Sequence, residues 1–171
     1  SSVTNIIQFL FGTTRLTSVD LSSFDLSQAT NGSYVFTNSN IENLDMHGVT
    51  AAQIYFSDLP SKLKKLDMSD MNIKYSDGGW YFYQMSKLES VDLSNTTLNS
   101  MKSIQFSGLS SLKTVNMENF YAPDCNSINT IFAGTSGLTN LNISGLNMPS
   151  LKDVSYMFKS SGLTGTLDLS S

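Results

Sequence analysis

The sequence predicts a β-rich solenoid of about seven stacked coils, each 22–26 residues long, with one parallel sheet and short helical or irregular return segments. Three observations predict it. An apolar block recurs at a nearly constant interval, apolar and polar residues alternate inside each block, and a phenylalanine precedes every block. A single such strand cannot bury its apolar face, so the copies must stack and share one core.

The recurring block has the form L-x-x-[LV]-[DN]-[LMI], so each copy is a leucine-rich repeat. It covers residues 16–21, 41–46, 63–68, 88–93, 112–117 and 138–143, and a seventh copy with one extra residue covers 163–169. The polar residue at its centre is Asp20, Asp45, Asp67, Asp92, Asn116, Asn142 or Asp168. Alternation with period two is typical of a strand with one buried face.

The segments between the blocks carry three further apolar columns, which we expect to fill the core. Four residues after the central polar residue stand Phe24, Val49, Met71, Thr96, Phe120 and Leu146. Two residues later stand Leu26, Ala51, Ile73, Leu98, Ala122 and Met148. The phenylalanines ahead of the blocks are Phe11, Phe36, Phe56, Phe82, Phe106, Phe132 and Phe158, and we expect them to enter the core from the opposite side.

Composition excludes several functions. Charged residues make up 14 % of the chain and the net charge is −4, which argues against a nucleic-acid binder. No apolar run approaches the roughly 18 residues that a membrane span needs, so we expect no membrane insertion within this chain. The single cysteine, Cys125, excludes a disulfide framework or a cysteine metal site, and we expect no cofactor. Both ends lack a polar capping unit, so we expect residues 1–171 to be one domain whose flanking repeats or cap lie outside it.

Two stretches resemble a known family. LKDVSYMFKSSGLTGTLDLS (residues 151–170) and LTSVDLSSFDLSQATNGSYVF (residues 16–36) are similar to the BspA-like leucine-rich repeats of bacterial cell-surface proteins. That family alternates a V-x-x-M-F segment with L-x-x-L-D-L-S-x-F-D. The resemblance implies a secreted protein, attached to the cell wall, whose repeats adhere to host or extracellular-matrix proteins or glycans. It brings no catalytic residues, so we expect a protein that is not an enzyme.

The aspartate column is the first candidate site. Asp45, Asp67 and Asp92 would project from one face of the sheet about 5 Å apart, with His47 beside Asp45 and Lys65. Neighbouring carboxylates repel unless donors, a cation or water compensate them. Three interpretations stay open: a scaffold bonded to neighbouring serines, a surface that contacts a ligand, and a Ca²⁺ ladder. We favour the scaffold.

The second candidate is the run DGGWYFY at residues 77–83, where the repeat is most irregular. Four consecutive aromatic side chains cannot all point into the core. Phe82 keeps the core register and Trp80 has a place at the core edge, while Tyr81 and Tyr83 are expected to be partly exposed. Exposed Tyr and Trp are favoured as binding anchors. We therefore expect ligand specificity in this run, with Trp80, Tyr81 and Tyr83 as candidate contacts.

The sequence thus predicts a non-enzymatic surface module that mediates adhesion. One alternative is a carbohydrate-active parallel β-helix enzyme, which also displays carboxylates on a sheet. Catalysis needs a local, irregular cluster of groups, whereas this chain repeats one residue in nearly every coil. The other alternative is an inert spacer that holds another binding domain away from the cell wall.

Overall fold

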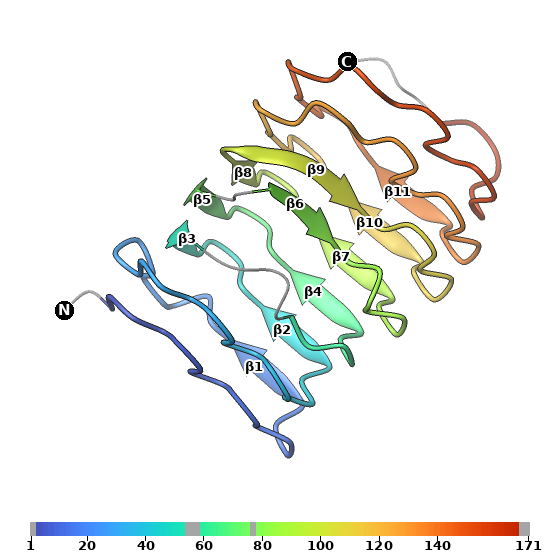
Figure 1. Ribbon diagram of the computed structural model, residues 1–171. Coiled ribbons are helices and arrows are strands. Elements are labelled where there is room, and N and C mark those ends of the chain that lie inside the picture. The colour runs from blue at the N-terminus through green and yellow to red at the C-terminus, as the bar shows by residue number, and fades with distance from the viewer. Residues whose placement is uncertain (1–2, 54–58, 76–77, 168–171) are drawn as a thin grey trace.

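The computed structural model describes residues 3–53, 59–75 and 78–167, which form a stack of parallel coils (Figure 1). These residues contain eleven short strands and no helix. The strands belong to three separate sheets that run along the stack and enclose the core, and the two termini lie at opposite ends. The predicted parallel solenoid is confirmed.

The main sheet is built from the recurring blocks. Its strands are β1 (Ser18–Asp20), β2 (Asn43–Asp45), β4 (Lys65–Asp67), β7 (Ser90–Asp92), β10 (Thr114–Asn116) and β11 (Asn140–Asn142), in the parallel order β1-β2-β4-β7-β10-β11. The register pairs each central polar residue with the next, for example Asp20 with Asp45 and Asp67 with Asp92. Six strands define five turns, so the expected count of about seven was slightly high. Asp168 lies outside the described residues.

The return segments add two sheets where one sheet with helical or irregular returns was expected. One contains β3 (Thr50–Gln53), β5 (Asn72–Tyr75) and β8 (Thr97–Leu98), and the other contains β6 (Gly78–Tyr81) and β9 (Met101–Gln105). Their inward residues also repeat from coil to coil, so Ile73 pairs with Leu98 and Trp80 with Ile104. Because these segments are extended in successive coils, each can pair with the same segment of the next coil, and the return of the chain does not require a helix.

A column of left-handed residues turns the chain away from the main sheet. It lies three positions after the central polar residue and contains Gly48, Asp70, Asn95, Asn119 and Gly145, with φ between 53° and 69°. Glycine adopts this conformation without strain, and Asn and Asp tolerate it better than other residues. The glycine, asparagine and aspartate residues at this position therefore allow the chain to turn after each main-sheet strand.

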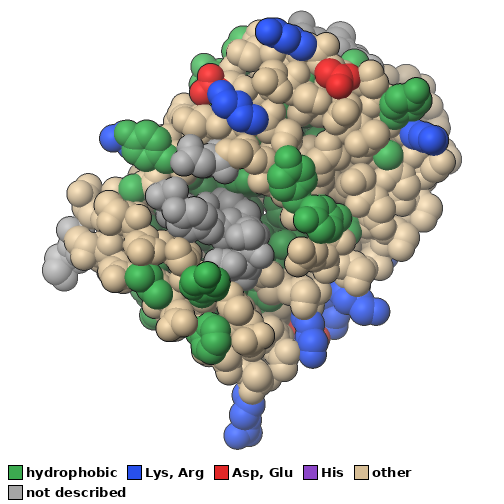
Figure 2. Space-filling view, viewed as in Figure 1, with side chains coloured by type: hydrophobic (Ala, Val, Ile, Leu, Met, Phe, Trp, Pro, Cys, Tyr) green, Lys and Arg blue, Asp and Glu red, His purple; other side chains and the backbone are tan. Residues whose placement is uncertain are grey.

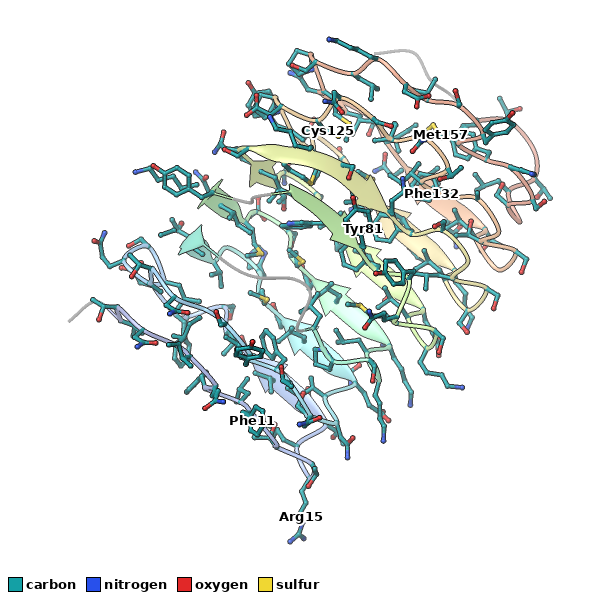
Figure 3. The ribbon with its side chains drawn as sticks, in the orientation of Figure 1. Phe11, Arg15, Tyr81, Cys125, Phe132 and Met157 are labelled. Carbon is teal, nitrogen blue, oxygen red and sulfur yellow. The ribbon has the colours of Figure 1, made fainter. Side chains whose placement is uncertain are left out.

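The predicted core columns are largely confirmed. Phe82, Phe106 and Phe132 are fully buried, and with the half-buried Phe158 they form a stack with centroid distances of 4.6, 5.8 and 5.8 Å. Figure 3 shows Phe132 within this core. The column at Leu26, Ala51, Ile73, Leu98, Ala122 and Met148 is buried throughout.

Phe11 is a wrong assignment. Its ring is 45 % exposed on the first coil, where Figure 3 labels it. Leu10 takes the core position instead, because its N–H donates to the carbonyl of Val35 as the N–H of Phe132 does to Met157. Leu10 packs against the core. Phe56 lies outside the described residues.

Candidate functional site

The aspartate column braces the turns that follow the main sheet. Oδ1 of each carboxylate accepts the N–H two residues later, at 2.8 to 3.0 Å. The pairs are Asp20–Ser22, Asp45–His47, Asp67–Ser69 and Asp92–Ser94. The hydroxyls of the three serines donate to the same oxygens at 2.6 Å. Such side-chain-to-backbone bonds are the typical Asx turn, and they support the scaffold interpretation.

Hydrogen bonds also limit repulsion along this column. The Nδ2 of Asn116 donates to Oδ2 of Asp92 at 3.2 Å, so an amide lies where a further carboxylate would repel. The hydroxyl and N–H of Ser22 lower the pKa of Asp20. Within the part of the chain that the structure describes, no three His, Cys, Asp or Glu side chains are placed to hold a metal ion. Cys125 is buried, and burial raises the pKa of its thiol.

The backbone of His47 bonds to Asp45, whereas its ring contacts Ser69 and Asp70. Its backbone N–H donates to Asp45, while its ring Nδ1 lies 2.9 Å from Oγ of Ser69 and 3.4 Å from Oδ2 of Asp70. A catalytic relay needs one ring nitrogen for the nucleophile and the other for the orienting carboxylate. Here both partners share Nδ1, so this arrangement is not that relay.

A ladder of alternating charge lies just ahead of the strands of the main sheet. Lys64 contacts Glu42 at 2.8 Å and Lys113 contacts Glu89 at 2.7 Å, each across neighbouring coils. The bond with Glu42 raises the pKa of Lys64, and the bond with Lys113 lowers the pKa of Glu89. Sequence reasoning missed this ladder, although the alternation of sign at one repeat position could have revealed it. Exposed pairs of this kind add little stability.

The run of aromatic residues divides between core and surface as predicted. Trp80 is 3 % exposed and meets Phe82 edge to face, with centroids 6.4 Å apart. Tyr81 is 49 % and Tyr83 57 % exposed, and their rings lie 6.1 Å apart. Figure 2 shows hydrophobic side chains at the centre of the face that carries β6 and β9. Asp77 lies outside the described residues.

The backbone also changes at this point of the repeat. At the corresponding turn of other coils, Tyr34, Thr130 and Tyr156 adopt left-handed conformations, with φ from 55° to 60°. Trp80 and Ile104 instead belong to the paired strands β6 and β9. Extended backbone turns these two side chains inward, whereas Tyr34 and Tyr156 are exposed. The irregular sequence therefore produces a distinct surface.

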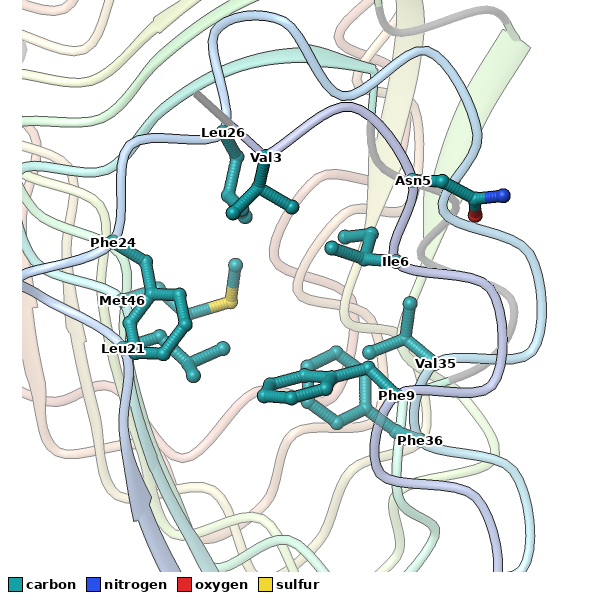
Figure 4. Close-up of a pocket in the computed structure, with 10 residues that line it drawn as sticks. All are labelled: Val3, Asn5, Ile6, Phe9, Leu21, Phe24, Leu26, Val35, Phe36 and Met46. Atoms are coloured by element: carbon teal, nitrogen blue, oxygen red, sulfur yellow. The ribbon is translucent and has the colours of Figure 1, made fainter. Parts of the chain in front are cut away.

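An apolar cavity lies at the N-terminal end of the stack. Its volume is about 230 Å³, and apolar side chains of the first two coils surround it (Figure 4). Its lining residues are Val3, Asn5, Ile6, Phe9, Leu21, Phe24, Leu26, Val35, Phe36 and Met46. Phe9 and Phe24 meet at 5.9 Å across its rim. The lining residues belong to the first two coils, whereas Tyr81 lies in β6.

Comparison with known families gives two matches. The family described as BspA type Leucine rich repeat region (6 copies) matches residues 55–164, which is more than half of the chain. The family described as Mycoplasma protein of unknown function, DUF285, matches residues 1–69. No curated protein and no solved structure matches the chain. Residues 3–53, 59–75 and 78–167 contain no helix long and apolar enough to cross a membrane.

Proposed function

Since this chain belongs to the BspA-type leucine-rich repeat family, we propose that it works at a cell surface, as a non-enzymatic repeat module that adheres to host or extracellular-matrix molecules. In this proposal, residues 1–171 act as one domain of a secreted protein held at the cell wall. The repeats supply a rigid frame, and the ligand is recognised where the repeat changes.

The pair Tyr81 and Tyr83 is the observation that carries this proposal. Both rings are about half exposed and lie side by side, and they alternate along the chain with the buried Trp80 and Phe82, so the core holds the surface in place. Tyrosine offers a large contact area at a low cost in side-chain entropy, and it can donate and accept hydrogen bonds. Because Trp80 is buried, we assign it the supporting role and leave ligand contact to the two tyrosines.

The main sheet is a weaker second surface. Oδ1 of Asp45, Asp67 and Asp92 is engaged in the local turn, and His47 is bonded to Ser69. Each group would have to give up or share a bond before it could bind a ligand, which reduces the net gain. We propose that these residues contribute secondary contacts at most.

Binding to immobilised mucin, fibronectin and whole cells tests this function. The chain should bind at least one of these, and the variant Tyr81→Ala/Tyr83→Ala should lose that binding. The matched control is Tyr75→Ala/Tyr121→Ala, which removes two exposed tyrosines associated with the β3-β5-β8 sheet. Equal loss in both variants would contradict a specific surface at Tyr81 and Tyr83.

The spacer remains the second candidate. It is favoured by the hydrogen-bonded main sheet that continues through five turns, since such a stack makes a stiff rod. Binding to none of the mucin, fibronectin and cell targets, with the fold intact by circular dichroism, would favour the spacer over adhesion.

A further inference from the structure

The ring of Tyr81 is positioned by a glycine. A Cβ added at Gly79 would lie 2.5 Å from both Cζ and Oη of Tyr81, and it would also clash with Oγ of Ser103. The end of the tyrosine ring therefore occupies the space that a side chain at position 79 would need. The Tyr81 hydroxyl lies 3.0 Å from Oγ of Ser103, which fixes the end of the ring on the neighbouring coil. The ring is thus held against the sheet before any ligand arrives.

Backbone conformation does not require this glycine. Gly78 has a φ of 85°, but Gly79 is not among the residues with positive φ. The register aligns Gly79 with Ser103, then with Ser127 and Asp153, so the three following coils have a side chain here. Only a coil with glycine at this position can hold a ring in this way. The glycine therefore serves the placement of Tyr81.

A row of polar groups continues from the ring along the stack. Ser103, Ser127 and Asp153 follow at the same position of successive coils, about 4.8 Å apart. The hydroxyl of Ser127 donates to Oδ2 of Asp153 at 3.5 Å. Hydrogen bonds from Ser155 lower the pKa of Asp153, so its carboxylate is ionised at neutral pH and accepts hydrogen bonds strongly.

We infer that the Tyr81 and Tyr83 surface binds a neutral oligosaccharide, with one sugar ring lying on Tyr81 and the next units extending over Ser103, Ser127 and Asp153. This inference rests on the proposed adhesion and names its ligand class. The electron-rich face of a tyrosine attracts the polarised C–H groups of a sugar. The polar groups of the row already bond to Tyr81, to each other or to Ser155, so they share their remaining hydrogen-bonding positions with the sugar's hydroxyls and Tyr81 supplies the main contact. The negative charge of Asp153 disfavours an anionic glycan.

A protein partner fits this surface less well. Protein hot spots cluster in well-packed, desolvated pockets, often with Arg or Trp beside Tyr. Here Trp80 is buried, and Gln105 is tied to the next coil through its bond to the carbonyl of Asn129. The groups that follow Tyr81 along the stack are partly exposed hydroxyls and a partly exposed carboxylate. A flat ring with a polar row beside it is better suited to a sugar chain.

The test is an array of neutral, sulfated and sialylated oligosaccharides, followed by calorimetry on any that bind. The wild-type chain should prefer neutral members. Gly79→Ala keeps both tyrosines but displaces the Tyr81 ring, and it should weaken binding at least about tenfold. Tyr81→Ala should weaken it as much, and Tyr75→Ala should leave it unchanged. Thermal melts of each variant separate loss of the site from loss of the fold.

The outcomes separate the ligand class from the function. Binding to fibronectin that depends on Tyr81, without binding to any glycan, would overturn the sugar inference and leave adhesion standing. A preference for sulfated or sialylated glycans would also overturn it. Equal glycan binding by wild type, Gly79→Ala and Tyr81→Ala would show that sugars bind elsewhere. Absence of any binding to glycan, protein or cells would contradict both proposals.

Discussion

Thr96 shows how a polar residue can occupy a core column without disturbing it. The neighbouring copies of this position, Met71 and Phe120, are apolar and buried, and Thr96 is equally buried. Its hydroxyl donates to the carbonyl of Met68 in the preceding coil. The polar Thr96, which breaks the apolar pattern, therefore supplies a hydrogen-bond donor to the backbone carbonyl of Met68. At this scale, hydrogen bonding explains an exception that hydrophobicity alone cannot.

Thr96→Val should destabilise the chain by about 1–3 kcal/mol, because the shape is kept while the buried carbonyl of Met68 loses its donor. Urea denaturation measures this change. Thr97→Val is the control, since Thr97 is only half buried and its strand favours β-branched residues. Equal stability of Thr96→Val and wild type would show that this bond contributes nothing.

Asp20 makes the stability of the turn after β1 depend on pH. Its pKa is lowered in the folded chain by Ser22, so the ionised form stabilises the fold. This contribution is present above the unfolded pKa of about 3.9 and is lost as the pH falls through the lower folded value. An NMR titration of the Asp20 carboxyl carbon should give a midpoint below 3.9 (the model-compound value). Ser22→Ala should raise that midpoint and Ser23→Ala should not; an unchanged midpoint in Ser22→Ala would contradict the assignment.

The phenylalanine stack is the feature that joins elements across the core. Phe106 is fully buried between Phe82 and Phe132, so its removal leaves a cavity with aromatic walls. Phe106→Ala should therefore cost about 3–5 kcal/mol in the free energy of unfolding. Chemical denaturation measures the loss, with the exposed Tyr83→Ala as control. A near-neutral Phe106→Ala would mean that the stack does not hold the coils together.

Elements differ in how far the sequence predicts them. The main-sheet strands follow from one strict pattern, L-x-x-[LV]-[DN]-[LMI], and six of them lie where it recurs. The sheets of the return segments were missed because their pairing depends on register between coils and not on a strong local pattern. Phe11 was misassigned for the same reason, since the hydrogen-bond register of the first coil selects Leu10.

The candidate site was predictable in part. Four consecutive aromatics must divide between core and surface, and this argument placed Trp80 inside and Tyr81 outside. The contact of Tyr81 with Gly79 and Ser103 depends on the orientation of the Tyr81 ring, which lies over Gly79, and on the pairing between β6 and β9. Neither follows from the period of the repeat. Sequence therefore indicates where the repeat changes, and the structure shows what that change builds.

The whole molecule is a stack in which each coil is stabilised mainly by its neighbours. Fully buried core residues such as Leu66, Leu93 and Val115 lie in the central coils, whereas Phe9 and Phe24 at the first coil are about 40 to 50 % exposed. Hydrogen exchange should therefore be slowest for the amides of β4, β7 and β10 and fastest in residues 3–27. Uniform protection along the chain would mean that the stack unfolds only as one cooperative unit.

Mapping the ligand surface by NMR tests the central claim that recognition lies where the repeat changes and not on the repeating sheet. The amide shifts of the wild-type chain are followed while a bound oligosaccharide from the array is added. Shift changes should cluster at residues 78–83 and 103–105 and extend to Ser127 and Asp153. Changes centred on β2, β4 and β7, around Asp45, Asp67 and Asp92, would contradict this account and assign binding to the aspartate column.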